Sequence, residues 1–225
     1  MQKIEQRPSP NHNERSPGRS VDILLLHYTG MRSGAEALAR LCDPAAKVSA
    51  HYLIEEDGRL FQMVPEDRRA WHAGLACWGG DSDVNGCSLG IELVNPGHEF
   101  GYRSFPEAQM RSLLGLAEEL CRRHPIPSHR VLGHSDVAPL RKEDPGELFD
   151  WPRLAAAGLG ILPRPGQVLE ETAAKARLSA FGYGYLEEDF AAVLRAFQRR
   201  FRPAAITGAL DGETAALIDG LPASA

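Results

Sequence analysis

Two stretches of the chain are mainly apolar, and each carries an ionisable side chain directly after apolar residues. The stretch "VDILLLHYTG" (21–30) contains His27, and "SLGIELVNPG" (88–97) contains Glu92. Short apolar runs that end in turn residues predict buried central strands. A polar group inside such a strand costs free energy unless it is paired or functional. The two strands therefore predict an α/β protein with a functional site where the strands end.

Up to residue 160, the rest of the chain predicts shorter strands and helices around these two. Helices are expected at 34–44, 105–125 and 151–158, a hairpin at 50–64 and a short strand at 130–134. The hairpin prediction rests on Asp57-Gly58, which stands between two apolar runs. The helix at 105–125 has the clearest pattern. Its predicted apolar face contains Leu113, Leu116, Ala117 and Leu120.

The composition changes after a segment rich in proline and glycine, which indicates more than one part to the chain. We predict an extended, poorly ordered N-terminal arm (1–20), an α/β domain (21–160), a linker (161–167) and a small three-helix domain (168–225). The three helices are expected near 168–180, 187–202 and 212–219. The middle helix has an apolar stripe of Phe190, Val193, Leu194, Phe197 and Phe201. We expect residues 1 to about 162 to fold and function alone.

Composition excludes several classes of partner. The 225 residues carry a net charge of −5, which gives no basic footprint for nucleic acid. No apolar run approaches the ~18 residues of a membrane span. Residues 1–20 contain no hydrophobic segment of a secretory signal, so the cytoplasm is the predicted location. The periplasm is the alternative if an export signal was removed. No protein partner can be inferred.

The cysteines do not indicate a zinc finger. The four are Cys42, Cys77, Cys87 and Cys121, and none forms a C-x-x-C pair. Scattered reduced thiols are the simplest interpretation, and a bridge between Cys77 and Cys87 is expected only in an oxidising compartment.

Two histidines and an aspartate predict a metal site. His27 and His134 each end an apolar strand, and Asp144 follows in the proline-stiffened loop "GHSDVAPLRKEDPG" (133–146). Taken one at a time, such residues are more often structural. Two imidazoles and one carboxylate together form the three-ligand set of a catalytic zinc, which leaves the fourth position for water. We therefore predict one Zn²⁺ per chain at His27, His134 and Asp144.

Two further residues complete a candidate catalytic set. Glu92 is the predicted general base for the water at the zinc. Lys142 lies two residues before Asp144, where its positive charge is suited to stabilising an oxyanion. The chain contains no H-E-x-x-H pair, so a zinc protease of that type lacks support.

Five ordered motifs give the chain a resemblance to a known family. They are "LLLHYTG", "SAHYLIEEDGRLFQMVPE", "RAWHAG", "NGCSLGIELVNPG" and "VLGHSDVAPLRKEDPG", spread over residues 20–160. In this order they resemble the zinc-dependent N-acetylmuramoyl-L-alanine amidases of the type-2 amidase group. The resemblance implies a mixed central β-sheet flanked by helices, with zinc at His27, His134 and Asp144. It assigns the catalytic acid to Glu92 and the catalytic lysine to Lys142.

The implied activity is hydrolysis of the amide bond between N-acetylmuramic acid, or its anhydro form, and L-alanine of the peptidoglycan stem peptide. This reaction belongs to cell-wall turnover or recycling, and the partners are peptidoglycan or muropeptides. The alternative is a non-catalytic peptidoglycan-recognition protein on the same fold. Whether intact peptidoglycan or small anhydro-muropeptides are the substrate stays open.

The resemblance also informs the remaining polar residues. Ala50 stands before His51 where phage and animal relatives have a tyrosine near the metal, so the chain resembles the bacterial recycling or lipoprotein branch. A structural role, or one behind the metal ligands, is expected for His51. Three residues are candidates for substrate binding: His72 by contact in the cleft, Arg69 through a peptide carboxylate, and Asn95 through an amide. A turn role is the stronger expectation for Asn95.

The C-terminal segment resembles a three-helix peptidoglycan-binding module. The resemblance rests on "LRAFQRRF" and "ITGALDGETAALI". Its phenylalanine stripe is also what a small helical bundle needs for a core. Any binding surface would lie on the exposed side, which the sequence does not identify.

Overall fold

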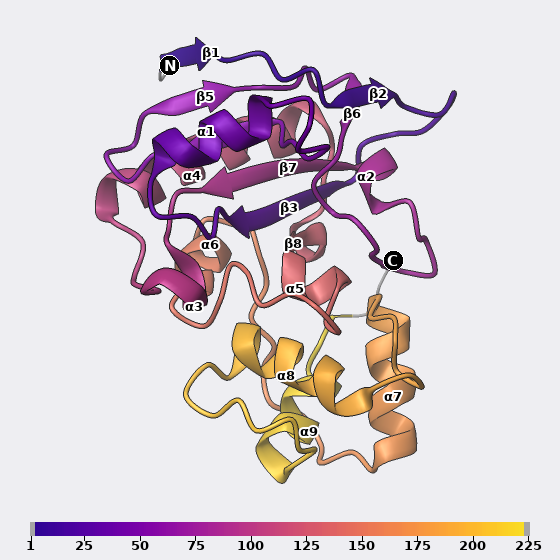
Figure 1. The fold of residues 1–225 in the computed structure, drawn as a ribbon. Helices are drawn as coiled ribbons and strands as arrows, with labels where there is room; N and C mark the ends of the chain where they lie inside the picture. Colours follow the sequence, from indigo (N-terminus) through magenta and orange to yellow (C-terminus); the bar gives the residue numbers. More distant parts are fainter. Residues whose placement is uncertain (1–2, 223–225) are drawn as a thin grey trace.

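A computed structural model describes residues 3–222, and its centre is a six-stranded sheet (Figure 1). The strand order is β1-β5-β4-β7-β3-β8. The strands are β1 Ile4–Gln6, β3 Ile23–Tyr28, β4 Tyr52–Ile54, β5 Leu60–Gln62, β7 Ser88–Leu93 and β8 Val131–Gly133. Strands β4, β7, β3 and β8 are parallel, whereas β5 runs antiparallel to β4 and parallel to β1. The predicted mixed central sheet is therefore confirmed.

The two apolar runs are neighbouring central strands. The parallel register of β3 and β7 pairs Ile23 with Ser88 and continues to His27 opposite Glu92. Side chains alternate between the faces of a sheet, and paired residues of neighbouring strands point to the same face. His27 and Glu92 therefore lie side by side on one face, near the carboxyl ends of both strands.

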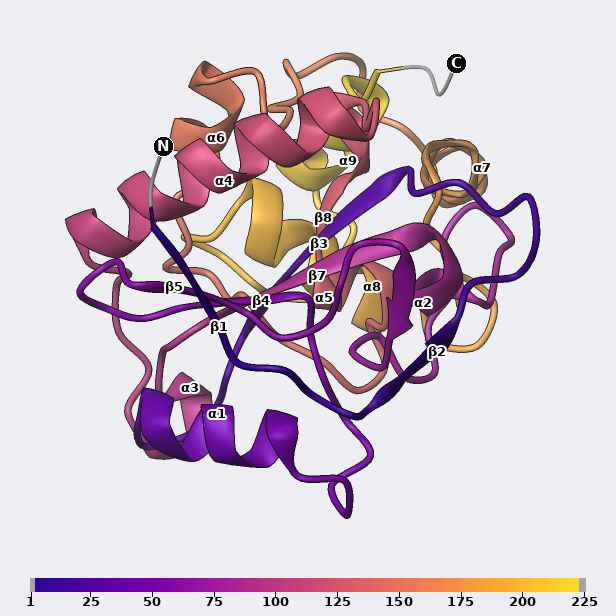
Figure 2. The same ribbon diagram turned by 90° about the horizontal axis from the view of Figure 1, so that it is seen from above.

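Helices cover both faces of the sheet (Figure 2). Helix α4 (Glu107–Arg123) and helix α6 (Trp151–Ala156) lie on one face, and α1 (Gly34–Cys42) lies on the other. The face of α4 that was predicted to be apolar is buried, and Pro106 directly precedes the helix. Leu24 and Leu26 of β3 join the core under α4, which leaves the opposite face to Ile23, Leu25 and His27.

The predicted hairpin joins β4 and β5. The two strands are antiparallel, and Gly58 in the turn has a φ of 89°. A residue with a Cβ rarely adopts this conformation, which accounts for the Asp-Gly pair. The Arg59 N–H donates a hydrogen bond to Asp57 Oδ1 at 3.0 Å and closes the turn.

Part of the N-terminal arm is paired in sheets, which the sequence did not indicate. Strand β1 pairs with β5, and β2 (His12–Glu14) pairs antiparallel with β6 (Arg68–Ala70). Arg15 follows β2 and donates hydrogen bonds to the carbonyls of Asn85, Gly86 and Ser88 at 2.9–3.2 Å. These partners are far away in the sequence, so the local composition of the arm does not predict that it pairs with them.

Four short helices occupy connections between the longer elements. They are α2 Val84–Cys87, α3 Gly97–Phe100, the 3₁₀ helix Ser128–Arg130, and α5 His134–Val137. None of these four was predicted, because a single helical turn has no periodicity to detect.

Three helices follow residue 170 at nearly the predicted positions. They are α7 Glu171–Phe181, α8 Phe190–Phe201 and α9 Gly212–Asp219. Their core is continuous with the sheet: one hydrophobic cluster contains Ile23, Leu25 and Leu132 together with Phe181, Val193, Phe197 and Ile218. The predicted domain boundaries stay predictions, but no break in packing separates the helices from the sheet. Among residues 3–222, no helix is long and apolar enough to cross a membrane.

Candidate metal and catalytic site

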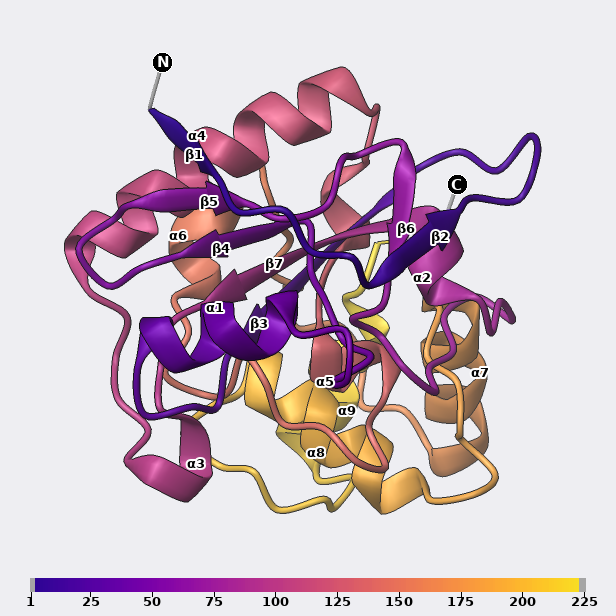
Figure 3. The same cartoon turned by 45° about the horizontal axis from the view of Figure 1, so that its top comes forward.

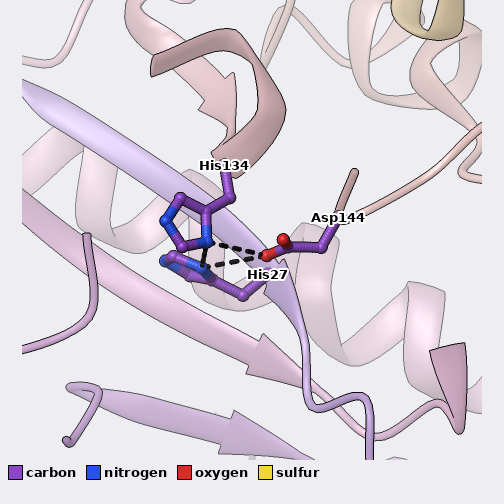
Figure 4. A group of neighbouring side chains, drawn as sticks. All are labelled: His27, His134 and Asp144. Carbon is purple, nitrogen blue, oxygen red and sulfur yellow. Dashed lines mark hydrogen bonds and ion pairs between the residues drawn. The ribbon is translucent and has the colours of Figure 1, made fainter. Parts of the chain in front are cut away.

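The three predicted metal ligands converge at one end of the sheet (Figure 4). His27 lies near the end of β3, His134 begins α5 directly after β8, and Asp144 lies in the loop that follows α5. The two Nδ1 atoms are 2.9 Å apart, and Asp144 Oδ2 lies 3.2 Å from His27 Nδ1 and 3.0 Å from His134 Nδ1. All three side chains are buried. The parallel pairing of β3 with β8 brings residues 107 positions apart into contact.

The surroundings of His134 fix which ring nitrogen carries hydrogen. His134 Nε2 lies 3.0 Å from the carbonyl oxygen of Ala73, which can only accept a hydrogen bond. Nε2 is therefore the protonated nitrogen of the neutral ring, and Nδ1 presents its lone pair to Asp144 and His27. Arg141 also donates to the Ala73 oxygen and holds this acceptor in place.

A second chain of hydrogen bonds fixes His27. His27 Nε2 lies 3.0 Å from His72 Nδ1, and His72 Nε2 lies 3.3 Å from Ser88 Oγ. The Ser88 hydroxyl donates to the Val84 carbonyl at 2.5 Å, so its oxygen is available to accept from His72. His72 Nδ1 then accepts from His27 Nε2–H, which leaves His27 Nδ1 without hydrogen.

The donor set fits a zinc ion. With these tautomers two nitrogen lone pairs and one carboxylate oxygen face one another, an arrangement that a bound cation would stabilise. Burial and the neighbouring His134 lower the pKa of His27 to about 4, so its ring is neutral near pH 7. Burial raises the pKa of Asp144, whereas the neighbouring His134 and His27 lower it, and the net shift is downward, so the carboxyl group is ionised near pH 7. Nitrogen and oxygen ligands in this number are typical of catalytic zinc.

Glu92 lies next to His27 in the sheet, and one of its oxygens has no partner. Its Oε2 is inaccessible to solvent and makes no hydrogen bond with any described residue. Burial and the charge of Asp144 raise the pKa of Glu92 well above the usual range, while Lys142 opposes the shift. A carboxyl group with a raised pKa is suited to taking up and releasing a proton near neutral pH.

A cavity of about 400 Å³ opens above these residues. Its lining includes the three candidate ligands, Glu92, His72 and Lys142, as well as Trp71 and Tyr28. Six of the eight predicted site residues therefore share one cavity, which is large enough for part of a small substrate.

Gly90 makes room for His72 beneath the cavity. A Cβ at Gly90 would lie 2.6 Å from the His72 ring, closer than atoms of two side chains can approach. The glycine in "SLGIELV" therefore allows His72 to reach His27 across the surface of β7.

Arg69, Asn95 and His51 lie outside the cavity lining. The Arg69 guanidinium pairs with Asp83 at 2.6 Å. Asn95 is fully buried, donates to the Arg103 carbonyl at 2.7 Å and accepts from the Gly97 N–H at 3.1 Å, as a turn residue does. Roles of Arg69 and Asn95 in substrate binding stay predictions. His51 accepts from the Gly90 N–H at 3.0 Å and lies 3.0 Å from the Arg68 carbonyl, which are structural contacts.

Three supporting residues have no role predicted from the sequence: Ser88, Arg141 and Asp136. Ser88 supports His72, Arg141 supports the acceptor of His134, and Asp136 lies two residues after His134. Asp136 could have been suspected, because an acid inside a buried segment needs partners. Ser88 and Arg141 carry no such signal, since their partners come from other elements.

Several known proteins are similar to this chain. The profile of a family described as N-acetylmuramoyl-L-alanine amidase matches residues 17–147. The chain is 34% identical to the N-acetylmuramoyl-L-alanine amidase AmiD of Escherichia coli strain K12, over 89% of this chain and 82% of the relative. It is also 34% identical to the 1,6-anhydro-N-acetylmuramyl-L-alanine amidase AmpD of Citrobacter freundii, over 66% of this chain and 87% of the relative.

A solved structure is similar over nearly the whole length. AmpDh3 from Pseudomonas aeruginosa, in complex with anhydromuramic pentapeptide, superimposes with a TM-score of 0.83 and 32% identity. The similarity covers 92% of this chain and 94% of that chain, so it includes the C-terminal helices as well as the sheet.

Proposed function

The chain belongs to the N-acetylmuramoyl-L-alanine amidase family, and from this we propose that it is a zinc amidase that releases the stem peptide from muramic acid in cell-wall recycling. The bond cleaved joins the lactyl carbonyl carbon to the nitrogen of L-alanine. The observation that carries the proposal is the convergence of His27, His134 and Asp144 in one cavity with Glu92 and Lys142.

Zinc would be held by Nδ1 of His27, Nδ1 of His134 and Oδ2 of Asp144. A bound zinc ion supplies positive charge that polarises a carbonyl group and lowers the pKa of water to near ~7. The hydrogen bonds to Ala73 and His72 orient the two imidazole rings and keep their Nδ1 lone pairs directed at the ion.

Glu92 moves the proton. Its carboxylate takes a proton from the attacking water while the water oxygen bonds to the lactyl carbonyl carbon. When the carbon–nitrogen bond breaks, the protonated Glu92 delivers this proton to the departing nitrogen of L-alanine. The raised pKa and the unpartnered Oε2 support this assignment, because the group is not tied up in another hydrogen bond.

Lys142 stabilises the negative charge on the carbonyl oxygen. Its side chain lines the same cavity as Glu92 and the candidate ligands. A cation held beside the reacting carbonyl oxygen stabilises the negative charge that develops on it. Lys142 and Asp144 belong to the same loop, so the conformation of this loop sets the position of both side chains.

Anhydro-muropeptides are the proposed substrates. The C. freundii relative is named for the 1,6-anhydro form, and the P. aeruginosa structure contains an anhydromuramic pentapeptide. Turnover on anhydro-muropeptide, on muropeptide with an intact reducing end and on purified sacculi distinguishes the substrates. We expect the highest kcat/KM with the anhydro form.

The test of the whole proposal combines metal analysis with peptide release. The wild-type protein, purified without chelator, should contain one zinc and release a peptide beginning with L-alanine. His134→Ala should lose tight zinc binding and turnover together. Binding of muropeptide without release by the zinc-loaded wild type would instead support the non-catalytic recognition protein.

A further inference from the structure

Helix α8 contacts the two segments that carry His134, Lys142 and Asp144 (Figures 1 and 3). It packs against α5, which begins with His134, and it reaches the loop that follows α5. Two consecutive arginines, Arg199 and Arg200, make these contacts at the end of α8.

Arg200 completes a buried network around Asp136. Both side chains are almost inaccessible, at 2% and 1% exposed, and Arg200 Nη1 lies 2.6 Å from Asp136 Oδ2. The same carboxylate accepts from the Tyr183 hydroxyl at 2.7 Å and from the Gly133 N–H at 2.8 Å. Gly133 directly precedes His134, so two residues of the C-terminal helical segment complete the network that fixes the backbone at a candidate ligand.

Arg200 is held from its other sides by the sheet and by aromatic rings. Its Nη2 donates to the carbonyl of Val131 in β8 at 2.9 Å. Its guanidinium lies 4.2 Å from the ring centre of Trp151 and 4.8 Å from that of Phe201. Two ring contacts and the hydrogen bonds to Asp136 and Val131 together restrict the direction of the guanidinium, so Arg200 is a rigid anchor.

Arg199 holds the loop between the other two site residues. Its Nη2 lies 3.1 Å from Glu143 Oε1, and its Nε lies 3.7 Å from Glu147 Oε2. Arg199 is only 10% exposed, so this pairing is shielded from solvent on the α8 side. Glu143 stands between Lys142 and Asp144 in the sequence, and the Ser135 N–H donates to the Asp144 carbonyl at 2.9 Å. The loop and α5 are therefore tied to each other and to α8.

We propose that α8 is a built-in part of the active site, in which Arg199 and Arg200 are positioning residues for the zinc ligands and for Lys142. Neither arginine touches substrate. Arg200 acts through Asp136 on His134, and Arg199 acts through Glu143 on Lys142 and Asp144. This inference rests on the proposed function, and it gives the C-terminal helices a task apart from any binding to the cell wall.

The test is a charge exchange in the full-length protein. Arg199→Glu places two acids together and should release the loop, while Glu143→Arg places two cations together. Each single variant is expected to weaken zinc binding and to lower kcat by ~10–100-fold, the usual effect of losing a group that orients a ligand. The double variant restores an opposite pair and should recover most of both losses.

Matched controls separate positioning from general damage. Arg195→Glu makes the same change one turn earlier on α8, where the arginine lies 3.9 Å from the exposed Asp189, and it should leave zinc affinity unchanged. Tyr183→Phe keeps the ring and removes one hydrogen bond to Asp136, so a smaller loss of zinc affinity is expected. Thermal unfolding and far-ultraviolet circular dichroism establish that each variant is folded.

Zinc affinity is measured by competition with a chromophoric chelator, and kcat is measured on a soluble anhydro-muropeptide. Wild-type zinc affinity and kcat in Arg199→Glu would overturn the inference. Folded single variants that lose function without recovery in the double variant would also overturn it, because the effect would not pass through the pair. Absence of turnover in the wild type would instead refute the proposed function. The zinc affinities of the variants would then still test whether α8 positions the metal ligands.

Discussion

At the scale of single residues, the proposed chemistry depends most directly on Glu92. It is the only proposed participant that moves a proton, and its Oε2 makes no hydrogen bond with any residue in the described range 3–222. Glutamine has the same shape and cannot take a proton from water. The substitution therefore separates chemistry from folding and from metal binding.

We expect Glu92→Gln to keep zinc and fold and to lower kcat by roughly 10²–10⁴-fold, the usual contribution of general acid–base catalysis. Metal analysis and release of the L-alanine peptide from a defined muropeptide measure both quantities. Glu118→Gln, an exposed acid on α4, is the matched control and should turn over normally. Unchanged kcat in zinc-loaded Glu92→Gln would show that Glu92 does not transfer the proton and has a structural role instead.

Ser88 tests the hydrogen-bond chain behind His27. Ser88→Ala removes the oxygen that accepts a hydrogen bond from His72 Nε2–H. The His72 ring can then carry its hydrogen on Nδ1, which no longer accepts from His27 Nε2–H. We expect zinc affinity to fall by ~10–100-fold with little change in secondary structure. Ser9→Ala removes another buried hydroxyl, which donates to the Leu41 carbonyl, and should leave zinc affinity as in the wild type. Equal affinities in both variants would show that the chain does not orient His27.

The candidate metal ligands are easier to predict from the sequence than the residues that hydrogen-bond to them. His27, Glu92 and His134 interrupt or end apolar strands, and this conflict with burial is visible locally. Ser88 is an ordinary strand residue in sequence, and its importance depends on where β7 places it relative to His72. Such hydrogen-bond chains follow from register between elements, which one sequence does not state.

At the scale of elements, His51 links three segments of the sheet region. It directly precedes β4, its Nδ1 accepts from the Gly90 N–H of β7, and its Nε2 lies 3.0 Å from the Arg68 carbonyl of β6. Only a neutral ring can accept and donate in this way. Burial lowers the pKa of His51 to about 3, against a hydrogen bond to Arg68 that favours protonation.

We therefore expect acid to weaken the fold through His51. Its pKa is lower in the folded than in the unfolded chain, so the unfolded chain binds more protons below pH 6.5 and stability falls as pH falls toward 3. The loss amounts to about 1.6 kcal/mol between pH 6.5 and 5, because the unfolded histidine is half protonated at pH 6.5 and the slope approaches ~1.4 kcal/mol per pH unit below it. Urea unfolding at several pH values measures it.

His51→Gln is the matching variant, because an amide can accept from Gly90 and donate to Arg68 without titrating. Its stability should depend less on pH than that of the wild type, by the amount given above. His129→Gln changes a partly exposed histidine whose pKa burial lowers by less than that of His51, so it should reduce the pH dependence less than His51→Gln does. Identical slopes for His51→Gln and the wild type would show that the ring is not held neutral.

Elements with strong periodicity were predictable, and single-turn elements were not. The 17 residues of α4 and the hairpin at Gly58 follow from local patterns. In contrast, β1 and β2 exist because β5 and β6 offer free edges, which is a property of the assembled sheet. Helix α5 has one turn only, and its position is set by His134 and Asp136 rather than by propensity.

At the scale of the whole molecule, the C-terminal helices and the sheet form one packed unit. Ile23 and Leu25 of β3 share a hydrophobic cluster with Phe197 of α8, and the buried pair of Arg200 and Asp136 crosses the same boundary. Composition marks the change from mixed strands and helices to helices alone, so it predicts a linker. It does not report which apolar faces meet after folding, and this is why an independent N-terminal part was expected.

We expect a single cooperative unfolding transition for the full chain. The amides of β3 and of α8 should exchange hydrogen with the same free energy of opening, measured by mass spectrometry at increasing urea. A chain ending at residue 162 uncovers Leu25, Leu132 and neighbouring apolar groups, and exposure of each such side chain costs up to ~1.5–3 kcal/mol. Typical domains have only ~5–15 kcal/mol of stability, so the truncated chain should lose cooperative unfolding and its zinc site. The loss should be as large for soluble muropeptides as for sacculi, since it comes from the site and not from wall binding. Two separate transitions, or full turnover of soluble muropeptide by the truncated chain, would support the division into independent domains instead.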